Sequence, residues 1–89
     1  MKKLLNTLYI TSENKYLSLD GENVVIKEEG AELGRMPLHN LEMIVTFSRA
    51  GASPALMGKC ADNNISIVFL TPSGSFLARV EGKTKGNVL

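Results

Sequence analysis

The sequence predicts an α+β fold that is mainly antiparallel β, with two small sheets in a sandwich-like arrangement and one main α-helix at about residues 53–63. Three observations predict it. Short β-branched runs alternate with turn residues through the first half of the chain. One segment carries the start and stop signals of a helix. An apolar run, a turn with proline and glycine, and a second strand pattern follow that segment.

The first half of the 89-residue chain predicts short strands separated by turns. Asp20-Gly21 and Glu29-Gly30 supply the positive φ that tight connections between strands need. Residues 38–40 follow a proline and are expected to form one helical turn. The expected strands of this half are 4–11, 16–20, 23–28, 33–37 and 42–47.

Residues 51–80 carry the clearest local pattern. Ser53 is a good N-cap because its hydroxyl can accept a hydrogen bond from a free amide, and Pro54 suits the first helical position. An apolar stripe runs through the helix, and two asparagines end it. Residues 65–70 predict a strand covered on both faces. Residues 71–74 predict a type I turn, and a strand is expected over 76–80.

Length and composition limit the class of protein. An 89-residue chain forms one domain with a thin core, and 44% hydrophobic with 21% charged residues is ordinary for a globular domain. No apolar run is long enough to span a bilayer, and no signal-peptide cleavage site follows the first residues. The single cysteine cannot form an internal disulfide. We therefore expect a cytoplasmic protein.

Charge and composition also suggest how the chain is organised. Residues 1–82 are expected to form one β-rich domain, and the polar, glycine-punctuated residues 83–89 have the composition of a linker leaving a domain. Residues 13–42 carry seven acidic against three basic residues, whereas residues 43–89 carry five basic against two acidic residues. This split allows one face to approach a polyanion, although a dedicated nucleic-acid domain is usually far more basic.

The residues that often carry chemistry do not form a catalytic pattern. His39 is the only histidine and lacks an acidic pair at metal-ligand spacing, so we interpret it as a turn residue. Cys60 lies on the helix stripe and is interpreted as a buried hydrophobic residue rather than a nucleophile. Glu28, Glu29 and Glu32 flank a turn and predict a solvated tip. The sequence predicts no catalytic residue, metal ligand or cofactor site in this chain.

One electrostatic feature remains at the start of the helix. Arg49 precedes a helix whose free amides and positive dipole end begin near Ser53, and together they can hold a phosphate. Lys59 lies about two turns further along and extends such a contact only if the helix lies along a duplex. The alternative, which the residues leave equally open, is that Arg49 is a solvated loop residue.

Five segments stand out by their order and spacing. They are TLYI at 7–10, YLSLDGEN at 16–23, MPLHNLE at 36–42, GASPALM at 51–57 and FLARV at 76–80. Together they resemble the N-terminal β-rich domain of the CRISPR-associated spacer-acquisition endonuclease and integrase, the Cas-one family, and are most similar to its type I-C form. The resemblance covers the whole chain, and residues 86–89 resemble the passage into that family's larger helical lobe.

The resemblance implies a role in antiviral defence. The family is a metal-dependent DNA endonuclease and integrase that, with the Cas-two protein, inserts new spacers into the CRISPR array. Its metal ligands, for Mg or Mn, lie in the helical lobe and none maps here, so the 89-residue chain alone is expected to be inactive as a nuclease.

For this domain the resemblance implies homodimerisation and contact with the backbone of double-stranded DNA. Duplex contacts in the family cluster around the loop before this helix. The predicted DNA-binding residues are Arg49, Ser53, Lys59 and Arg79. In some members a tyrosine of this domain wedges the DNA end open, but neither Tyr9 nor Tyr16 falls securely on that position.

Two other functions compete with this interpretation. A cytoplasmic homodimeric β-rich module that binds protein and no nucleic acid would show an exposed sheet face or edge with scattered basic residues. A small self-contained enzyme is opposed by the lack of a nucleophile, base or metal set. Salt-dependent binding to duplex DNA separates the integrase domain from the protein-binding module.

Overall fold

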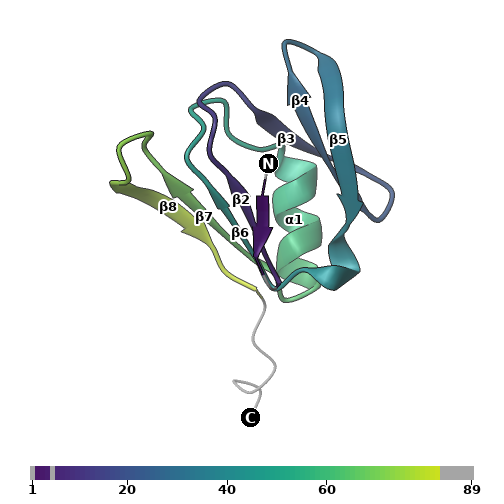
Figure 1. Ribbon diagram of the computed structural model, residues 1–89. Coiled ribbons are helices and arrows are strands. Elements are labelled where there is room, and N and C mark those ends of the chain that lie inside the picture. Colours follow the sequence, from purple (N-terminus) through teal and green to yellow (C-terminus); the bar gives the residue numbers. More distant parts are fainter. Residues whose placement is uncertain (1, 5, 83–89) are drawn as a thin grey trace.

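A computed structural model of the chain describes residues 2–4 and 6–82, and the expected linker over 83–89 lies outside the described residues (Figure 1). The elements in chain order are β1 (Lys2–Leu4), β2 (Thr7–Ile10), β3 (Tyr16–Asp20), β4 (Asn23–Glu28), β5 (Ala31–Pro37), a 3-10 turn (Leu38–Asn40), β6 (Met43–Thr46), α1 (Pro54–Asp62), β7 (Ser66–Leu70) and β8 (Phe76–Val80).

The strands form two sheets with the helix between them. One sheet has the order β1-β2-β6-β7-β8, and the other has the order β3-β4-β5. α1 contacts β3 of the smaller sheet and both β7 and β8 of the larger one (Figure 1). The predicted α+β class, with two small sheets and one main helix, is confirmed.

The larger sheet is mixed, whereas the prediction was mainly antiparallel β. β2 pairs with β6, and β6 with β7, in parallel, while the other neighbours pair antiparallel. The chain leaves β6, passes through α1 and returns in β7, which is a βαβ unit. A helical crossover returns the chain to the same end of the sheet, so the two strands it joins run in the same direction.

Most predicted strands lie within two residues of the observed ones. β3, β4, β8 and the 3-10 turn have the predicted bounds. The single strand predicted over 4–11 is wrong, because β1 and β2 pair antiparallel and the chain reverses between Leu4 and Thr7. β5 begins two residues earlier than predicted, because Glu29 and Gly30 have φ of 52° and 84° and complete the chain reversal just before Ala31.

The helix forms for the reasons that the sequence indicated. The Ser53 hydroxyl accepts a hydrogen bond from the backbone nitrogen of Leu56 at 3.1 Å, and Pro54 is the first helical residue. Leu56 and Cys60 are fully buried. Burial disfavours the thiolate and raises the pKa of Cys60 to about 11, so the interpretation of this residue as a buried hydrophobic one is confirmed.

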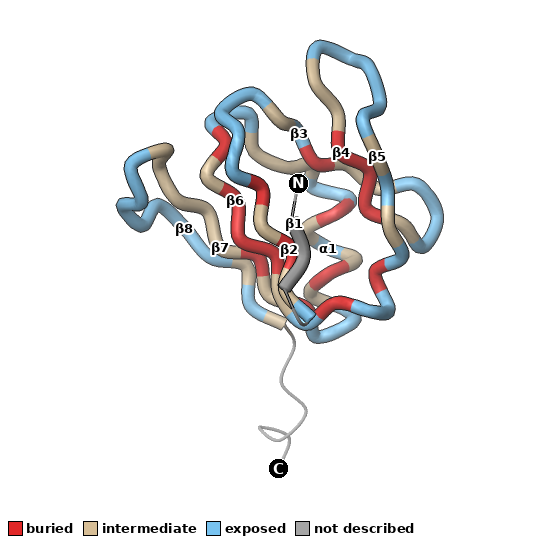
Figure 2. Tube along the Cα trace, viewed as in Figure 1, coloured by how far each residue is buried: buried red, intermediate tan, exposed pale blue. Residues whose placement is uncertain are grey.

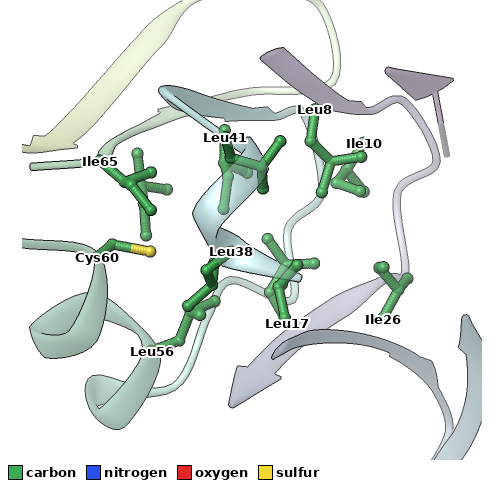
Figure 3. Close-up of a cluster of buried hydrophobic side chains, with 12 residues drawn as sticks. Leu8, Ile10, Leu17, Ile26, Leu38, Leu41, Leu56, Cys60 and Ile65 are labelled. Atoms are coloured by element: carbon green, nitrogen blue, oxygen red, sulfur yellow. The ribbon is translucent and has the colours of Figure 1, made fainter. Parts of the chain in front are cut away.

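The core lies between the two sheets (Figure 3). Leu8 and Ile10 of β2 meet Leu17 and Ile26 of the smaller sheet, and side chains of α1 complete the cluster. Figure 2 shows that buried segments lie in the strands beside α1, while the hairpin ends are exposed. The buried cluster comprises Leu8, Ile10, Leu17, Val24, Ile26, Leu38, Leu41, Ile44, Leu56, Cys60, Ile65 and Ile67.

Candidate nucleic-acid interface

The loop between β6 and α1 is held by hydrogen bonds to the segment before β3. The backbone nitrogen of Arg49 donates to the carbonyl oxygen of Glu13 at 2.9 Å, and the Ser48 hydroxyl donates to the same oxygen at 2.8 Å. The Ser48 hydroxyl also accepts from the backbone nitrogen of Ala50 at 3.1 Å. The backbone nitrogen of Ser48 donates to the Thr46 hydroxyl at 3.1 Å. These bonds fix the backbone on both sides of Arg49.

The second half of the loop pairs with β3. The backbone nitrogen of Leu17 donates to the carbonyl oxygen of Gly51 at 3.1 Å, and that of Ser53 donates to the carbonyl oxygen of Leu17 at 2.8 Å. Gly51 has a φ of 80°, in the left-handed region that favours glycine. The chain therefore enters α1 along a defined path, and Arg49 stands on a fixed loop.

The Arg49 side chain carries an unpaired charge. Arg49 is exposed, and it forms no ion pair with any residue of the described part of the chain. Lys15, Arg35, Lys59 and Arg79 are paired with carboxylates, whereas Lys27, like Arg49, forms no ion pair within the described residues. A cation without an internal partner is available to an external anion.

The amides at the start of α1 are mostly occupied, contrary to the expectation of a free phosphate cradle. The nitrogen of Ser53 bonds to Leu17, and the nitrogens of Leu56 and Met57 bond to the hydroxyl and carbonyl oxygens of Ser53. Pro54 has no N–H. The Ser53 hydroxyl accepts within the cap but keeps its own proton to donate. Contact between Ser53 and DNA stays a prediction.

Lys59 and Arg79 each have a carboxylate partner. The ammonium of Lys59 lies 2.8 Å from the carboxylate of Glu22, which joins α1 to the β3–β4 turn. The guanidinium of Arg79 lies 2.5 Å from the carboxylate of Glu81. Exposed pairs of this kind are weak and screened by salt, so a phosphate can replace the carboxylate. DNA contact by Lys59 and Arg79 stays a prediction.

A cavity of about 420 Å³ opens between the Arg49 loop and the β7–β8 hairpin. Arg49 and Arg79 both border it, whereas Ser53 and Lys59 do not. Val80 packs against the core, and side chains alternate along a strand, so the Arg79 side chain points to the opposite face of the sheet. The lining residues are Ser48, Arg49, Ala50, Gly51, Ala52, Met57, Phe69, Leu77, Ala78, Arg79 and Val80.

Two of the three acidic residues that the sequence singled out, Glu28 and Glu32, are engaged in ion pairs, and Glu29 is exposed. Glu28 lies 2.8 Å from the ammonium of Lys15. Glu32 accepts from Arg35, and this hydrogen bond lowers the pKa of the Glu32 carboxyl. His39 is exposed. Within residues 2–4 and 6–82, three or more His, Cys, Asp or Glu side chains nowhere gather in a way that could hold a metal ion.

The helices of this described part are also too short or too polar to cross a membrane.

The sequence profile described as CRISPR associated protein Cas1 matches residues 8–89. The chain belongs to the Cas1 family. Over 100% of its length, it is 52% identical to the CRISPR-associated endonuclease Cas1 2 of Rhodospirillum rubrum, and the match covers 26% of that protein. Again over 100% of its length, it is 46% identical to the CRISPR-associated endonuclease Cas1 1 of Chlorobaculum tepidum, and the match covers 26% of that protein. The chain thus spans about a quarter of these Cas1 relatives and corresponds to their N-terminal part.

Solved structures of Cas1 proteins share the fold. A CAS1 protein from Thermotoga maritima superposes with a TM-score of 0.74 at 14% identity, over 93% of this chain and 25% of that one. A TtCas1–DNA complex superposes with a TM-score of 0.67 at 16% identity, over 92% of this chain and 32% of that one. A chain of a Cas6-RT-Cas1–Cas2 complex superposes with a TM-score of 0.80 at 13% identity, over 91% of this chain and 9% of that one. The resemblance to the Cas-one family is confirmed, and the type I-C form stays a prediction.

Proposed function

We propose that this chain is the part of a Cas1 endonuclease and integrase that contacts the backbone of double-stranded DNA and pairs with a second copy of itself. The observation that carries the DNA contact is Arg49, an exposed and unpaired cation on a loop fixed by backbone hydrogen bonds. Relatives solved as a Cas1–DNA complex and as a Cas1–Cas2 complex support DNA and Cas2 as partners of the whole protein. In this proposal, catalysis with Mg or Mn and the insertion of spacers belong to the part of the Cas1 protein that lies outside the length matched by this chain.

The chemistry of the contact follows from the side chain. A guanidinium offers paired N–H donors that match two oxygens of one phosphate. Such a contact positions DNA without reading its sequence, and it weakens as salt rises because counterions released into a more concentrated solution gain less entropy. The fixed backbone of Arg49 reduces the entropy that binding must remove. The proposed function is therefore sequence-independent and salt-sensitive binding.

Replacing Arg49 by alanine is expected to weaken binding of a blunt duplex about tenfold, or about 1.4 kcal/mol. The slope of log affinity against log salt should fall by about one, because one phosphate contact is lost. Fluorescence anisotropy with a labelled duplex over a series of low salt concentrations measures both quantities.

Arg35→Ala is the matched control for this experiment. Arg35 has the same charge, but it lies on β5 of the smaller sheet and is held by two carboxylates, at 2.9 Å from Asp20 and 2.7 Å from Glu32, so its loss should change DNA affinity little. Equal effects of the two variants would reject Arg49 as a specific contact. If the unaltered chain shows no salt-dependent duplex binding at all, the protein-binding module becomes the better interpretation.

The pairing of two copies is proposed for the outer face of the larger sheet. Tyr9, Val45, Val68 and Arg79 are neighbours in register across β2, β6, β7 and β8. The alternate residues of these strands belong to the core, so this row faces away from it. α1 and the smaller sheet both lie on the core side (Figure 1). Among the described residues no helix or sheet packs on the outer face, and Val45 at its centre is 9% exposed between its neighbours in the row.

Two features of this face favour a second copy as its cover. Parallel strands that are apolar on both sides are normally covered on both sides. A register shift in β8 pairs Phe76 with Leu70, the residue after the core-packed Phe69, so Phe76 lies on the outer face, where it is 63% exposed. Arg79 and Glu81 place a cation and an anion side by side at the β8 edge of the larger sheet. In a pair with two-fold symmetry each copy can offer its cation to the carboxylate of the other.

Phe76→Glu is expected to shift a dimer to a monomer, because it places a charge in the apolar contact. Sedimentation velocity over a range of protein concentrations measures the change. Leu33→Glu is the control, since Leu33 is 54% exposed but lies on β5 of the other sheet. The proposed face is wrong if the Phe76 variant remains dimeric or if the unaltered chain is monomeric at every concentration.

A further inference from the structure

We propose that α1 is a rigid spacer that sets where the chain leaves this domain relative to the DNA contact, and that Gly82 is the positioning residue at its far end. The inference rests on the proposed function and deepens it, since it concerns where Arg49 stands. The chain matches the N-terminal quarter of its Cas1 relatives. In proteins of that length, the path by which the chain leaves this domain decides where the rest of the protein lies relative to the bound DNA.

Gly82 lies too close to Asn64 to carry a side chain. A Cβ built on Gly82 would be 2.5 Å from the side-chain oxygen of Asn64, 2.6 Å from its Cα and 2.7 Å from its carbonyl carbon. Two of these three atoms belong to the backbone, so a change of rotamer at Asn64 cannot make room. Only glycine lets the two backbones come this close.

The backbone of Asn64 is held in place by the end of α1. Its nitrogen donates to the carbonyl oxygen of Ala61 at 3.3 Å, and the nitrogen of Ile65 donates to that of Cys60 at 2.7 Å. Asn64 has a φ of 63°, a conformation that asparagine tolerates at the end of a helix. Ile65 is 2% exposed and belongs to the core. Asn64 therefore cannot move aside without disrupting the helix end.

The pairing of β8 brings Gly82 to this point. Val80 lies opposite Ile67 in the antiparallel pair of β7 and β8, so the residues after Val80 run beside the turn between α1 and β7. Val80 packs against the core, and α1 also contacts β8. The chain thus reaches Gly82 along a defined path.

The other end of α1 is tied to the loop that carries Arg49. The nitrogen of Ser53, the N-cap residue, donates to the carbonyl oxygen of Leu17 on β3 at 2.8 Å. Between its two ends the helix contacts β3, β7 and β8. α1 has nine residues and is about 14 Å long. The Arg49 loop and Gly82 therefore belong to one rigid unit and lie at opposite ends of this helix.

Backbone order measured by NMR relaxation tests the inference on the 89-residue chain. In the unaltered chain, the amides of Glu81 and Gly82 should have order parameters of about 0.85, like those of α1. Gly82→Ala should lower the order parameters at both positions below about 0.6, because the end of β8 must move away from Asn64. Duplex affinity should stay within about twofold, because the Arg49 loop lies at the other end of the helix. Order parameters below about 0.6 at these positions in the unaltered chain overturn the inference.

Two control variants distinguish a positioning role from a general effect on the fold. Gly58→Ala is the same change within α1, where an added Cβ would meet nothing within 4 Å. Val24→Ala truncates a fully buried residue of β4 and destabilises the domain far from Gly82. Both should leave the order at positions 81 and 82 unchanged. The inference is wrong if either control loosens these positions as much as Gly82→Ala does, or if Gly82→Ala leaves them ordered.

Adding Asn64→Gly to Gly82→Ala tests whether the contact is with the helix end or only with a side chain. The double variant should remain loose at positions 81 and 82, because the Cα and carbonyl carbon of residue 64 are still in the way. Recovery of order in the double variant would show that the amide side chain alone makes the contact, and this result would overturn the inference.

Arg49→Ala separates failure of this inference from failure of the proposed function. If it weakens duplex binding while positions 81 and 82 of the unaltered chain are loose, the DNA contact stands and the rigid spacer is wrong. If it does not weaken duplex binding, the proposed DNA contact is wrong, and the inference falls with it even where these positions are ordered.

Discussion

Leu56→Ala is expected to lower the free energy of unfolding by about 3 kcal/mol, which is the largest effect that we predict. Leu56 is fully buried on α1, where the helix contacts both sheets. Removing its side chain loses apolar burial and leaves a void that two sheets and a helix cannot easily close. In a small domain whose total stability is about 5–15 kcal/mol, this is a large fraction.

Urea unfolding followed by circular dichroism measures this loss. Leu33→Ala is the control, because Leu33 is 54% exposed on β5 and the same truncation there should cost about 0.5 kcal/mol or less. If both variants lost equal stability, α1 would not be packed between the sheets in solution.

The helix and the hairpins could be predicted because their determinants are local. Ser53 and Pro54 lie next to the residues that they organise, and the observed cap is the predicted one. The reversal at Glu29 and Gly30 likewise depends on backbone angles of adjacent residues. Patterns of this kind are complete within a few positions of the chain.

The arrangement of the larger sheet could not be predicted in the same way. β2 and β6 pair in parallel although the whole smaller sheet separates them in the chain. The break between β1 and β2 was missed because the apolar residues around Asn6 form no single facing pattern. The strand–helix–strand order around α1 was the signal for the parallel pair of β6 and β7.

In the candidate site, too, the feature that depends on neighbouring residues was predicted and those that depend on distant residues were missed. Arg49 was predicted from its place before a helix start, and the structure leaves it exposed and unpaired. The ion pair between Lys59 and Glu22 joins residues 37 positions apart, and no pattern in the sequence predicts it. The cavity was also missed, because its walls come from the loop, α1, β7 and β8.

The placement of Arg49 depends on a buried hydroxyl that the sequence did not single out. Ser48 is 4% exposed and bonds to the carbonyl oxygen of Glu13 and to the nitrogen of Ala50. Hydroxyls that bond to nearby backbone groups often organise loops after strands, so the Thr46-x-Ser48 spacing was the available signal. One side chain thus ties the loop to the segment before β3 and holds Arg49 at the surface.

Ser48→Ala is accordingly expected to lower the free energy of unfolding by about 2 kcal/mol, since it removes both hydrogen bonds of a buried hydroxyl, the one donated to the carbonyl oxygen of Glu13 and the one accepted from the nitrogen of Ala50. The amides of Arg49 and Ala50 should exchange with solvent faster, which hydrogen exchange by NMR measures. Duplex binding should weaken although Arg49 is unchanged, because the loop must then be ordered on binding. Ser12→Ala, at an exposed position of the neighbouring segment, is the control. If exchange and affinity in the Ser48 variant match those of the control, the loop is held by its backbone bonds alone, and the hydroxyl has no part in presenting Arg49.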